Sequence, residues 1–164
     1  MANMLLDGSH KALVSLDSFV VTKSIPTAFA GATTNARGDS GGTQATFTLF
    51  AVTGDVEVGI YGVCTTDLAS TGAGTLALGI TGNTAIVNAA TTATTIDVNE
   101  VWMSTIPAIG MPLDSLNFYV IGNGVDIVET TGTADIESGN IYYVALWRPL
   151  SAGSTIVSSY PPTS

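Results

Sequence analysis

The sequence contains little of what most enzymes and metal proteins use for chemistry. Its 164 residues include one cysteine, Cys64, and one histidine, His10. A single cysteine excludes an intramolecular disulfide framework and a multi-cysteine metal site. Because Cys64 falls within a predicted strand, we interpret it as a small buried apolar residue. Neither a phosphate-binding glycine loop nor a Cys-x-x-Cys pair is present, so we expect no cofactor, no metal and no enzymatic activity.

Positive charge is equally scarce. The chain has 4 Lys and Arg residues against 13 Asp and Glu residues, which gives a net charge of -9. Charged residues make up 10% of the chain, where about 25% is usual. Binding to a phosphate backbone requires several cations, and an anionic membrane would repel this chain. We therefore expect neither nucleic acid nor membrane as a partner. A surface with so few charges suits a protein packed among copies of itself or a partner, with a plain soluble β domain as the alternative.

Long apolar runs are missing as well. No stretch of about 20 apolar residues could span a membrane as a helix. The first residues, MANMLLDGSHKALVSL, lack the positively charged start and unbroken apolar run of a secretory signal. We expect the protein to stay in the cytoplasm of the cell that makes it, unless it is carried out in a particle.

Alternation of apolar and polar residues is the dominant pattern that is present. In Thr46–Thr66, two alternating runs flank Thr53-Gly54-Asp55, which predicts a β-hairpin because Gly54 can adopt the positive φ of a tight turn. The same reasoning predicts a hairpin closed by Thr81-Gly82-Asn83. It also predicts one around Asn123-Gly124, between strands at 116–121 and 125–130. The remaining predicted strands are Ala12–Thr22, Val101–Ile106 and the nearly continuous apolar Ile141–Trp147, which we expect at the centre of a sheet.

Short strands separated by turns recur along the chain, and no helical period competes with them. This pattern predicts an all-β protein, an antiparallel β-sandwich that is jelly-roll-like or immunoglobulin-like. We expect an extended N-terminal arm at residues 1–11, a single domain at 12–159 and a C-terminal tail at 160–164. The domain includes a long loop, Ser24–Gln44, and a structureless loop of this length often serves a function or is ordered by a partner.

Two short motifs overlap in that loop. Gly38-Asp39-Ser40-Gly41-Gly42 matches the segment around the nucleophile of chymotrypsin-like serine proteases, but Ser40 follows His10 too closely to leave room for the first barrel of that fold. Arg37-Gly38-Asp39 is the tripeptide that integrins read. We favour turn chemistry as the explanation of both motifs, and a hydrolase using Ser40 remains the alternative from a different class.

Acidic pairs and aromatic residues are the other candidates for function. Asp55/Glu57, Asp97/Glu100 and Asp135/Glu137 lack the spacing of a calcium loop, and we interpret them as solvated turn residues. Aromatic residues concentrate in the last third of the chain, where packing is the favoured interpretation and an interface or sugar platform the alternative. These aromatics are Trp102, Phe118, Tyr119, Tyr142, Tyr143 and Trp147.

Three blocks of the sequence resemble small virion-associated proteins encoded in the structural gene clusters of tailed bacteriophages. The blocks are TLFAVTGDVEVGIYGVCTTDLAS, GNTAIVNAATTATTIDVNEVW and IYYVALWRPLSAG. The resemblance covers roughly residues 44–153 and implies a capsid decoration (cement) protein that sits on the capsid surface of the virion. It implies the major capsid protein and further copies of the chain, as a homotrimer, as partners. A tail, baseplate or head-fibre component that contacts the host surface is the alternative.

If this role is correct, the arm and the long loop are the expected contacts with the lattice, ordered on binding. The candidate contact residues are Met4, Leu5, Leu6, Lys11, Pro26, Phe29 and Arg37.

Overall fold

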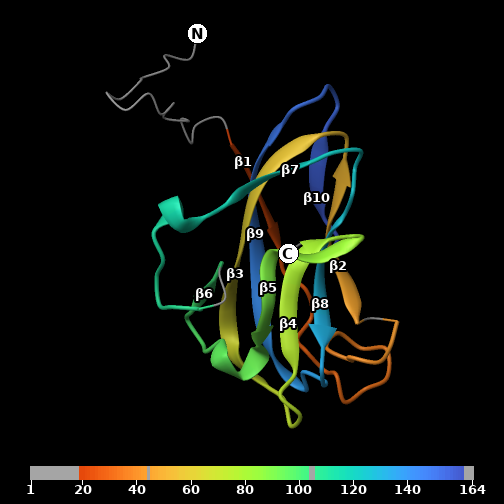
Figure 1. Ribbon diagram of the computed structural model, residues 1–164, viewed down its shortest axis with the longest axis vertical. Helices are drawn as coiled ribbons and strands as arrows, with labels where there is room; N and C mark the ends of the chain where they lie inside the picture. Colours follow the sequence, from red (N-terminus) through yellow and green to blue (C-terminus); the bar gives the residue numbers. More distant parts are fainter. Residues whose placement is uncertain (1–18, 44, 104–105, 161–164) are drawn as a thin grey trace.

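The computed structural model describes residues 19–43, 45–103 and 106–160, which form two antiparallel five-stranded sheets. Sheet I contains β1 (Val20–Ser24), β9 (Ser138–Pro149), β3 (Val56–Ala69), β6 (Val101–Trp102) and β7 (Phe118–Ile121). Sheet II contains β10 (Thr155–Ser158), β2 (Thr46–Thr53), β8 (Ile127–Gly132), β4 (Thr75–Ile80) and β5 (Asn83–Thr92). Two 3₁₀ turns, η2 (Ala93–Thr95) and η3 (Leu113–Ser115), lie in the connections. The predicted all-β sandwich is confirmed (Figure 1).

The strand pairing is that of a jelly roll. β1 pairs with β9, β2 with β8, β3 with β7 and β4 with β5, and successive pairs alternate between sheet I and sheet II. The chain is therefore one long hairpin of strand pairs wrapped around a common core, the arrangement of double-sheet jelly rolls. The strand β10 extends sheet II beside β2, and β6 adds a short pairing at the edge of β3.

Two of the three predicted hairpins are wrong in their pairing, although the strands themselves exist. β2 and β3 lie in different sheets, and so do β7 and β8, so Gly54 and Asn123-Gly124 form corners between the sheets. All three residues have positive φ, as expected for tight turns. The two corners contact each other, since the Gly124 amide donates to the Gly54 carbonyl at 3.0 Å. Turn chemistry indicates where the chain reverses, and it does not specify whether the strands then pair or separate.

The other strand predictions are mostly confirmed. The β4–β5 hairpin forms, and β9 lies between β1 and β3, as its apolar sequence indicates. β6 is shorter than the predicted 101–106 strand. Residues 12–18 of the predicted first strand lie outside the described residues, as does the predicted arm.

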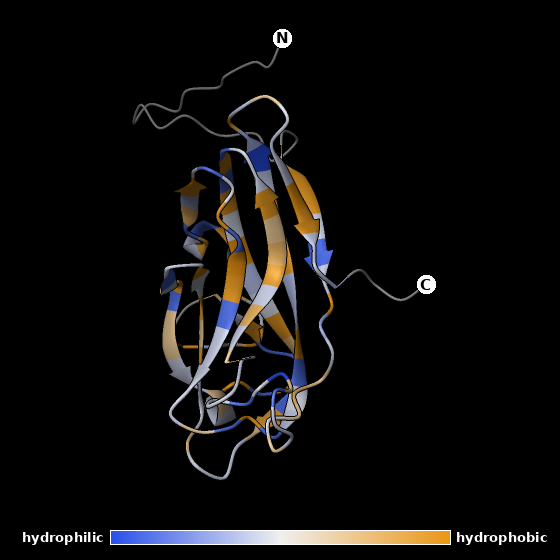
Figure 2. Ribbon diagram, turned by 90° about the vertical axis from the view of Figure 1, so that its right-hand side faces the viewer, coloured by the Kyte–Doolittle hydropathy of each residue, from blue (hydrophilic) through white to orange (hydrophobic). Residues whose placement is uncertain are grey.

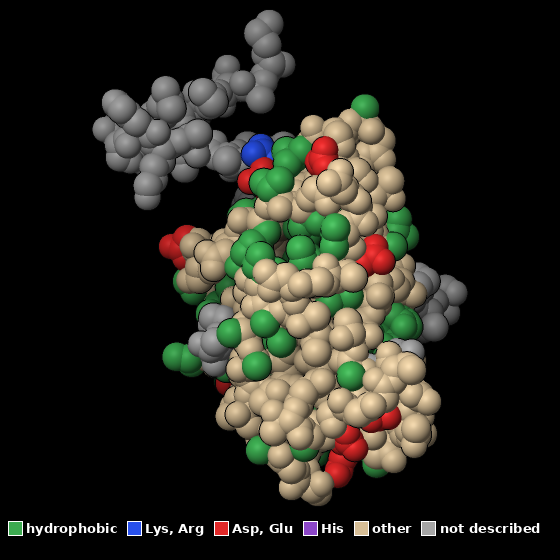
Figure 3. Space-filling model, turned by 45° about the vertical axis from the view of Figure 1, so that its right-hand side comes forward, with side chains coloured by type: hydrophobic (Ala, Val, Ile, Leu, Met, Phe, Trp, Pro, Cys, Tyr) green, Lys and Arg blue, Asp and Glu red, His purple; other side chains and the backbone are tan. Residues whose placement is uncertain are grey.

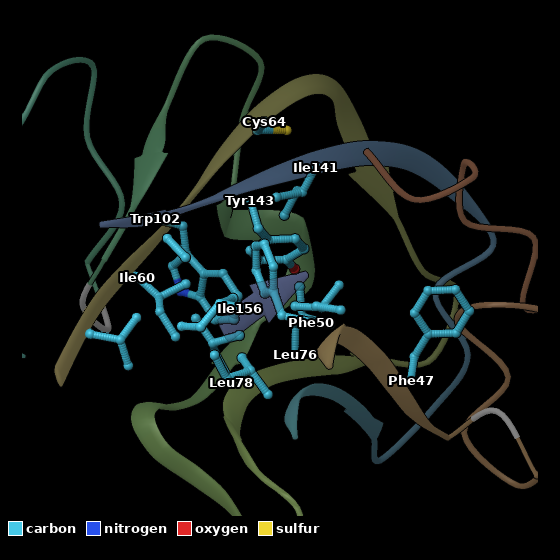
Figure 4. Packing of buried hydrophobic residues seen from close by; sticks show 14 of the residues in the cluster. Phe47, Phe50, Ile60, Cys64, Leu76, Leu78, Trp102, Ile141, Tyr143 and Ile156 are labelled. Carbon is cyan, nitrogen blue, oxygen red and sulfur yellow. The ribbon is translucent and has the colours of Figure 1, made fainter. Parts of the chain in front are cut away.

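The two inner faces of the sandwich form a single hydrophobic core. Alternate residues of β3 and β9 point inward, and orange hydrophobic segments run along the strands of both sheets in Figure 2. In Figure 4, Trp102, Tyr143 and Ile156 point into the same cluster, while Phe47 lies apart beside the loops. The ring of Tyr160, where the predicted C-terminal tail begins, stacks on that of Phe47 with centroids 4.7 Å apart.

Thr133 has a backbone conformation that β-branched residues rarely adopt. It precedes β9 with φ of +66° and is exposed. The left-handed region costs an ordinary L residue roughly 1–2 kcal/mol, and asparagine tolerates it better. We expect Thr133→Asn to raise the free energy of unfolding by about 0.5–1 kcal/mol, measured by urea denaturation. Thr92→Asn, at an exposed position with φ of -61°, is the control and should not stabilise the protein. Equal stabilisation by both substitutions would contradict the explanation by strain.

Candidate interaction surface

The outer face of sheet I, which points away from the core, is rich in apolar side chains. The strand register aligns Val21 of β1, Leu146 of β9, Gly59 of β3 and Phe118 of β7 in one row across this face. Tyr61, Val63, Tyr142 and Val144 extend the face along β3 and β9, and Val120 extends it along β7. Val120 is 72% exposed and Val21 is 64% exposed. Exposed apolar residues that gather on one sheet face are typical of a contact surface.

Gly59 allows the chain to fold over part of this face. A Cβ atom at Gly59 would lie 2.8 Å from Leu116 Cδ2 and 3.1 Å from the Phe118 ring. Leu116, which ends the η3 turn, is consequently only 7% exposed. The connection between β6 and β7 therefore covers the middle of the outer face of sheet I, and Val21 and Val120 at its two edges stay exposed.

The outer face of sheet I also carries the described cations that are not buried. Arg148 forms an ion pair with Glu57 of the neighbouring strand. The Lys23 ammonium lies 3.7 Å from the centre of the Tyr142 ring, a cation–π contact. The view in Figure 3 shows mostly tan and green atoms, with scattered red acidic groups and blue basic atoms near the top.

The long loop before β2 is held by a buried ion pair. The guanidinium of Arg37 donates two hydrogen bonds to the carboxylate of Glu129 on β8, one from Nε and one from Nη2 at 2.8 Å. The Tyr143 hydroxyl on β9 donates to the same carboxylate at 2.7 Å. The cation also lies 3.8 Å from the centre of the Phe29 ring. Both charged side chains of the pair are 1% exposed, so the contact joins the loop to both sheets inside the protein.

Burial and the charges of neighbouring groups shift the pKa values of Arg37 and Tyr143. Burial by itself lowers the pKa of Arg37, but the attraction and hydrogen bonds of Glu129 outweigh it, so the pKa is raised. Burial, followed by the charge of Glu129, raises the pKa of Tyr143 well above its usual value. Arg37 therefore stays charged and Tyr143 stays protonated, which preserves the three-residue network.

The candidate contact residues in the loop are buried. Pro26, Phe29 and Arg37 all have low exposure, 3% for the last two. They pack the loop onto the sandwich and do not form part of the surface, which differs from the expectation of a lattice contact at these positions. Met4, Leu5, Leu6 and Lys11 lie outside the described residues.

The residues of both loop motifs are also buried or hydrogen-bonded within the protein. With Arg37 3% exposed and Asp39 9% exposed, the Arg-Gly-Asp tripeptide is not displayed to a receptor. The Ser40 backbone amide and Oγ each donate to Asp135 Oδ1 at 2.8 Å. These two hydrogen bonds lower the pKa of Asp135. Ser40 thus has a carboxylate partner, and His10 lies outside the described residues, so the structure brings no triad together in its described part.

Acidic side chains mostly accept hydrogen bonds from nearby turns. Asp55 accepts from the Asn123 amide, Glu100 from the Asp97 amide and Asp67 from the Val98 amide. The bonds of Asp55 and Glu100 agree with their interpretation as turn residues, whereas Glu57 lies within β3 and pairs with Arg148. Among the described residues, no group of three or more His, Cys, Asp or Glu side chains could hold a metal ion.

Three of the six aromatic residues named above for the last third of the chain belong to the core. Trp102 and Tyr143 are fully buried, and Trp147 is 7% exposed. Phe118 and Tyr142 instead lie on the outer face of sheet I, so the interpretation as packing is correct for the first group and the interface remains open for the second.

Cys64 is buried, 1% exposed, and burial raises the pKa of its thiol to about 11. The thiolate is the reactive form, and at pH 8 the native thiol is protonated as well as shielded. We expect a negligible reaction with a thiol-specific reagent such as DTNB in the native state, and reaction of one thiol per chain in urea. Rapid labelling of the native protein at pH 8 would contradict this placement.

Comparison of the chain with protein-family models, curated proteins and solved structures finds no match in any of the three. No helix in the described part of the chain has the length and hydropathy needed to cross a membrane.

Sequence reasoning missed two groups of residues. Glu129 and Tyr143 were not predicted as partners of Arg37, although a lone charge within the apolar strand IVETTG is a recognisable sign of a buried pair. The exposed Val21 and Val120 were missed because their face depends on which strands pair, which the local pattern does not give.

Proposed function

We propose that this chain is a non-catalytic structural protein of a bacteriophage virion, which decorates the capsid and stabilises it by bridging major capsid subunits. The observation that carries the proposal is the outer face of sheet I, where exposed apolar side chains lie beside the start of the described chain. We propose that this face, together with Met4, Leu5, Leu6 and Lys11, contacts the lattice. Binding only to the assembled lattice would stabilise it by mass action over many sites.

The chemistry of the described side chains supports a structural role. Arg37 is held by Glu129, Ser40 by Asp135, and Arg148 by Glu57, and Cys64 is buried. Each of these reactive or charged groups is engaged inside the chain. The net charge of -9 further favours a protein partner over nucleic acid or an anionic membrane.

The fold is compatible with this role. Double-sheet jelly rolls occur in viral capsid domains, and they also occur in lectins. The resemblance of the three sequence blocks to phage structural proteins adds support, and we propose that the chain acts as a homotrimer.

The second candidate is a tail, baseplate or head-fibre component that binds the host surface. The half-buried Tyr61 and Tyr142 on the outer face of sheet I favour it, because aromatic rings on a sheet can stack against sugar rings. Binding of the isolated protein to host cells would support this candidate over decoration.

The decisive experiment is the copy number of this chain in the purified particle, measured by quantitative peptide mass spectrometry against the major capsid protein. One copy per few capsid subunits or more is expected. A handful of copies per particle would move the protein to the tail or a fibre, and absence would overturn the virion role.

A pair of variants then tests the surface. Val120→Asp places a charge on the outer face of sheet I and should reduce capsid occupancy. Val157→Asp places the same charge on β10 of sheet II, where Val157 is 58% exposed, and should leave occupancy unchanged. Equal occupancy of both variants would remove the outer face of sheet I from the proposal.

A further inference from the structure

We infer that residues 1–18 of the chain dock onto the outer face of its own sheet I in the isolated protein and shield the apolar surface there. The inference goes beyond the proposed function, because it concerns the free chain. If the segment already occupies this face, the capsid lattice would have to displace it or bind beside it.

The first argument is where the described chain begins. Phe19 is not part of β1, and its ring lies 4.9 Å from that of Phe118 on β7. The Arg148 guanidinium on β9 lies 5.6 Å from the same ring. In sheet I, β9 and β3 separate β1 from β7. The Phe19 side chain therefore lies across the outer face, and residues 1–18 precede this residue directly in the sequence.

The second argument is length. Neighbouring strands are about 4.8 Å apart, so the width from β1 to β7 is roughly 15 Å. An extended chain advances at most about 3.5 Å per residue, so fewer than half of the 18 residues outside the described chain could cross the face. A tether this short also gives the segment a high effective concentration at the face, which favours its own chain over another copy.

The third argument is chemical complementarity. The segment MANMLLDGSHKALVSLDS contains apolar residues, among them Leu13, Val14 and Leu16, which match the exposed Val21 and Val120. It also contains two acidic residues, Asp7 and Asp17. Lys23 and Arg148, the described cations that are not buried, both lie on the outer face of sheet I. A segment with both apolar and acidic residues therefore complements this face, which carries exposed apolar side chains and both of these cations.

The test is photo-crosslinking of the isolated full-length protein, with p-benzoyl-phenylalanine in place of Val120. The exposure of Val120 makes the replacement compatible with the fold, which circular dichroism checks. At dilute concentration, we expect crosslinked monomer in which mass spectrometry finds the p-benzoyl-phenylalanine at position 120 joined to a peptide within residues 1–18. The same group in place of Val157 is the control, with at least fivefold less crosslinking to that segment.

Other outcomes would overturn the inference. Crosslinks from position 120 to residues 19–160 of a second copy would assign the face to self-association. Absence of crosslinks to residues 1–18, or equal yields at positions 120 and 157, would show that the segment does not occupy the face. Leu16→Asp in the crosslinking variant should lower the yield at least fivefold, whereas Ser15→Asp should lower it less. None of these results depends on the presence of capsids, so they are independent of the copy-number experiment.

Discussion

Arg37→Ala is expected to lower the free energy of unfolding by about 3–5 kcal/mol, because it leaves the Glu129 carboxylate buried without its cation. Both side chains are 1% exposed, so water cannot replace the lost partner. The Tyr143 hydroxyl would remain as a donor to Glu129, at 2.7 Å, but a neutral hydrogen bond does not compensate a buried charge. Urea denaturation followed by tryptophan fluorescence measures the effect.

The exposed ion pair of the same protein is the matched control. Arg148 and Glu57 have side chains 36% and 21% exposed, and Arg148→Ala should cost about 1 kcal/mol or less. The double variant Arg37→Met, Glu129→Leu removes both buried charges and should be more stable than Arg37→Ala alone. Equal losses for Arg37→Ala and Arg148→Ala would show that the buried pair does not hold the loop to the sandwich.

The buried pair explains how a long segment without strand or helix is compatible with a compact fold. The loop passes from sheet I at β1 to sheet II at β2, and Arg37 anchors it midway. Its backbone is anchored too, since the Ile136 amide donates to the Gly38 carbonyl at 2.9 Å. A Cβ atom at Gly38 would lie 2.4 Å from the Ile136 carbonyl oxygen. The residues that resemble a protease motif are therefore needed for close packing between two loops.

Strand positions could be predicted from the sequence because each strand alternates over its own length. The runs on either side of Gly54 were located correctly by this period, and so was β9. Their partners could not be predicted in the same way. A strand with an apolar face can pair with its neighbour in sequence or pack across the core from it, and both arrangements bury the same residues.

The candidate site was predicted less well than the fold for a related reason. Phe29 and Arg37 were selected because they lie in a long loop with few structural signals, and loops commonly carry contacts. The structure instead places both inside the protein. Arg37 binds Glu129, an acidic partner 92 residues away in sequence, and the Phe29 ring packs against Arg37. The outer face of sheet I becomes visible only when β1, β9, β3 and β7 are aligned, since each strand contributes at most three of the residues named for this face.

Trp102→Ala should also destabilise the protein by about 3–5 kcal/mol, the usual cost of removing a large aromatic side chain from a core. Trp102 is fully buried, although β6 contains only two residues. It pairs with Gly62 of β3, where a Cβ atom would lie 2.8 Å from Ile141 Cγ2. Its ring packs edge-on against Tyr143, with centroids 6.5 Å apart. The Trp102 side chain therefore anchors the segment between η2 and the connection that crosses the outer face of sheet I.

Two controls separate this packing role from a general effect of losing an aromatic ring. Trp102→Phe retains a six-membered ring and loses the five-membered part of the indole, with the hydrogen bond from Nε1 to Thr91 Oγ1, 3.3 Å long, so it should cost less than Trp102→Ala. Phe118→Ala removes a ring that is 37% exposed and should also cost less. Urea denaturation followed by circular dichroism compares the three variants. If Trp102→Ala were no more destabilising than Phe118→Ala, the two-residue strand would not be anchored by its side chain, and the position of Leu116 over Gly59 would need another cause.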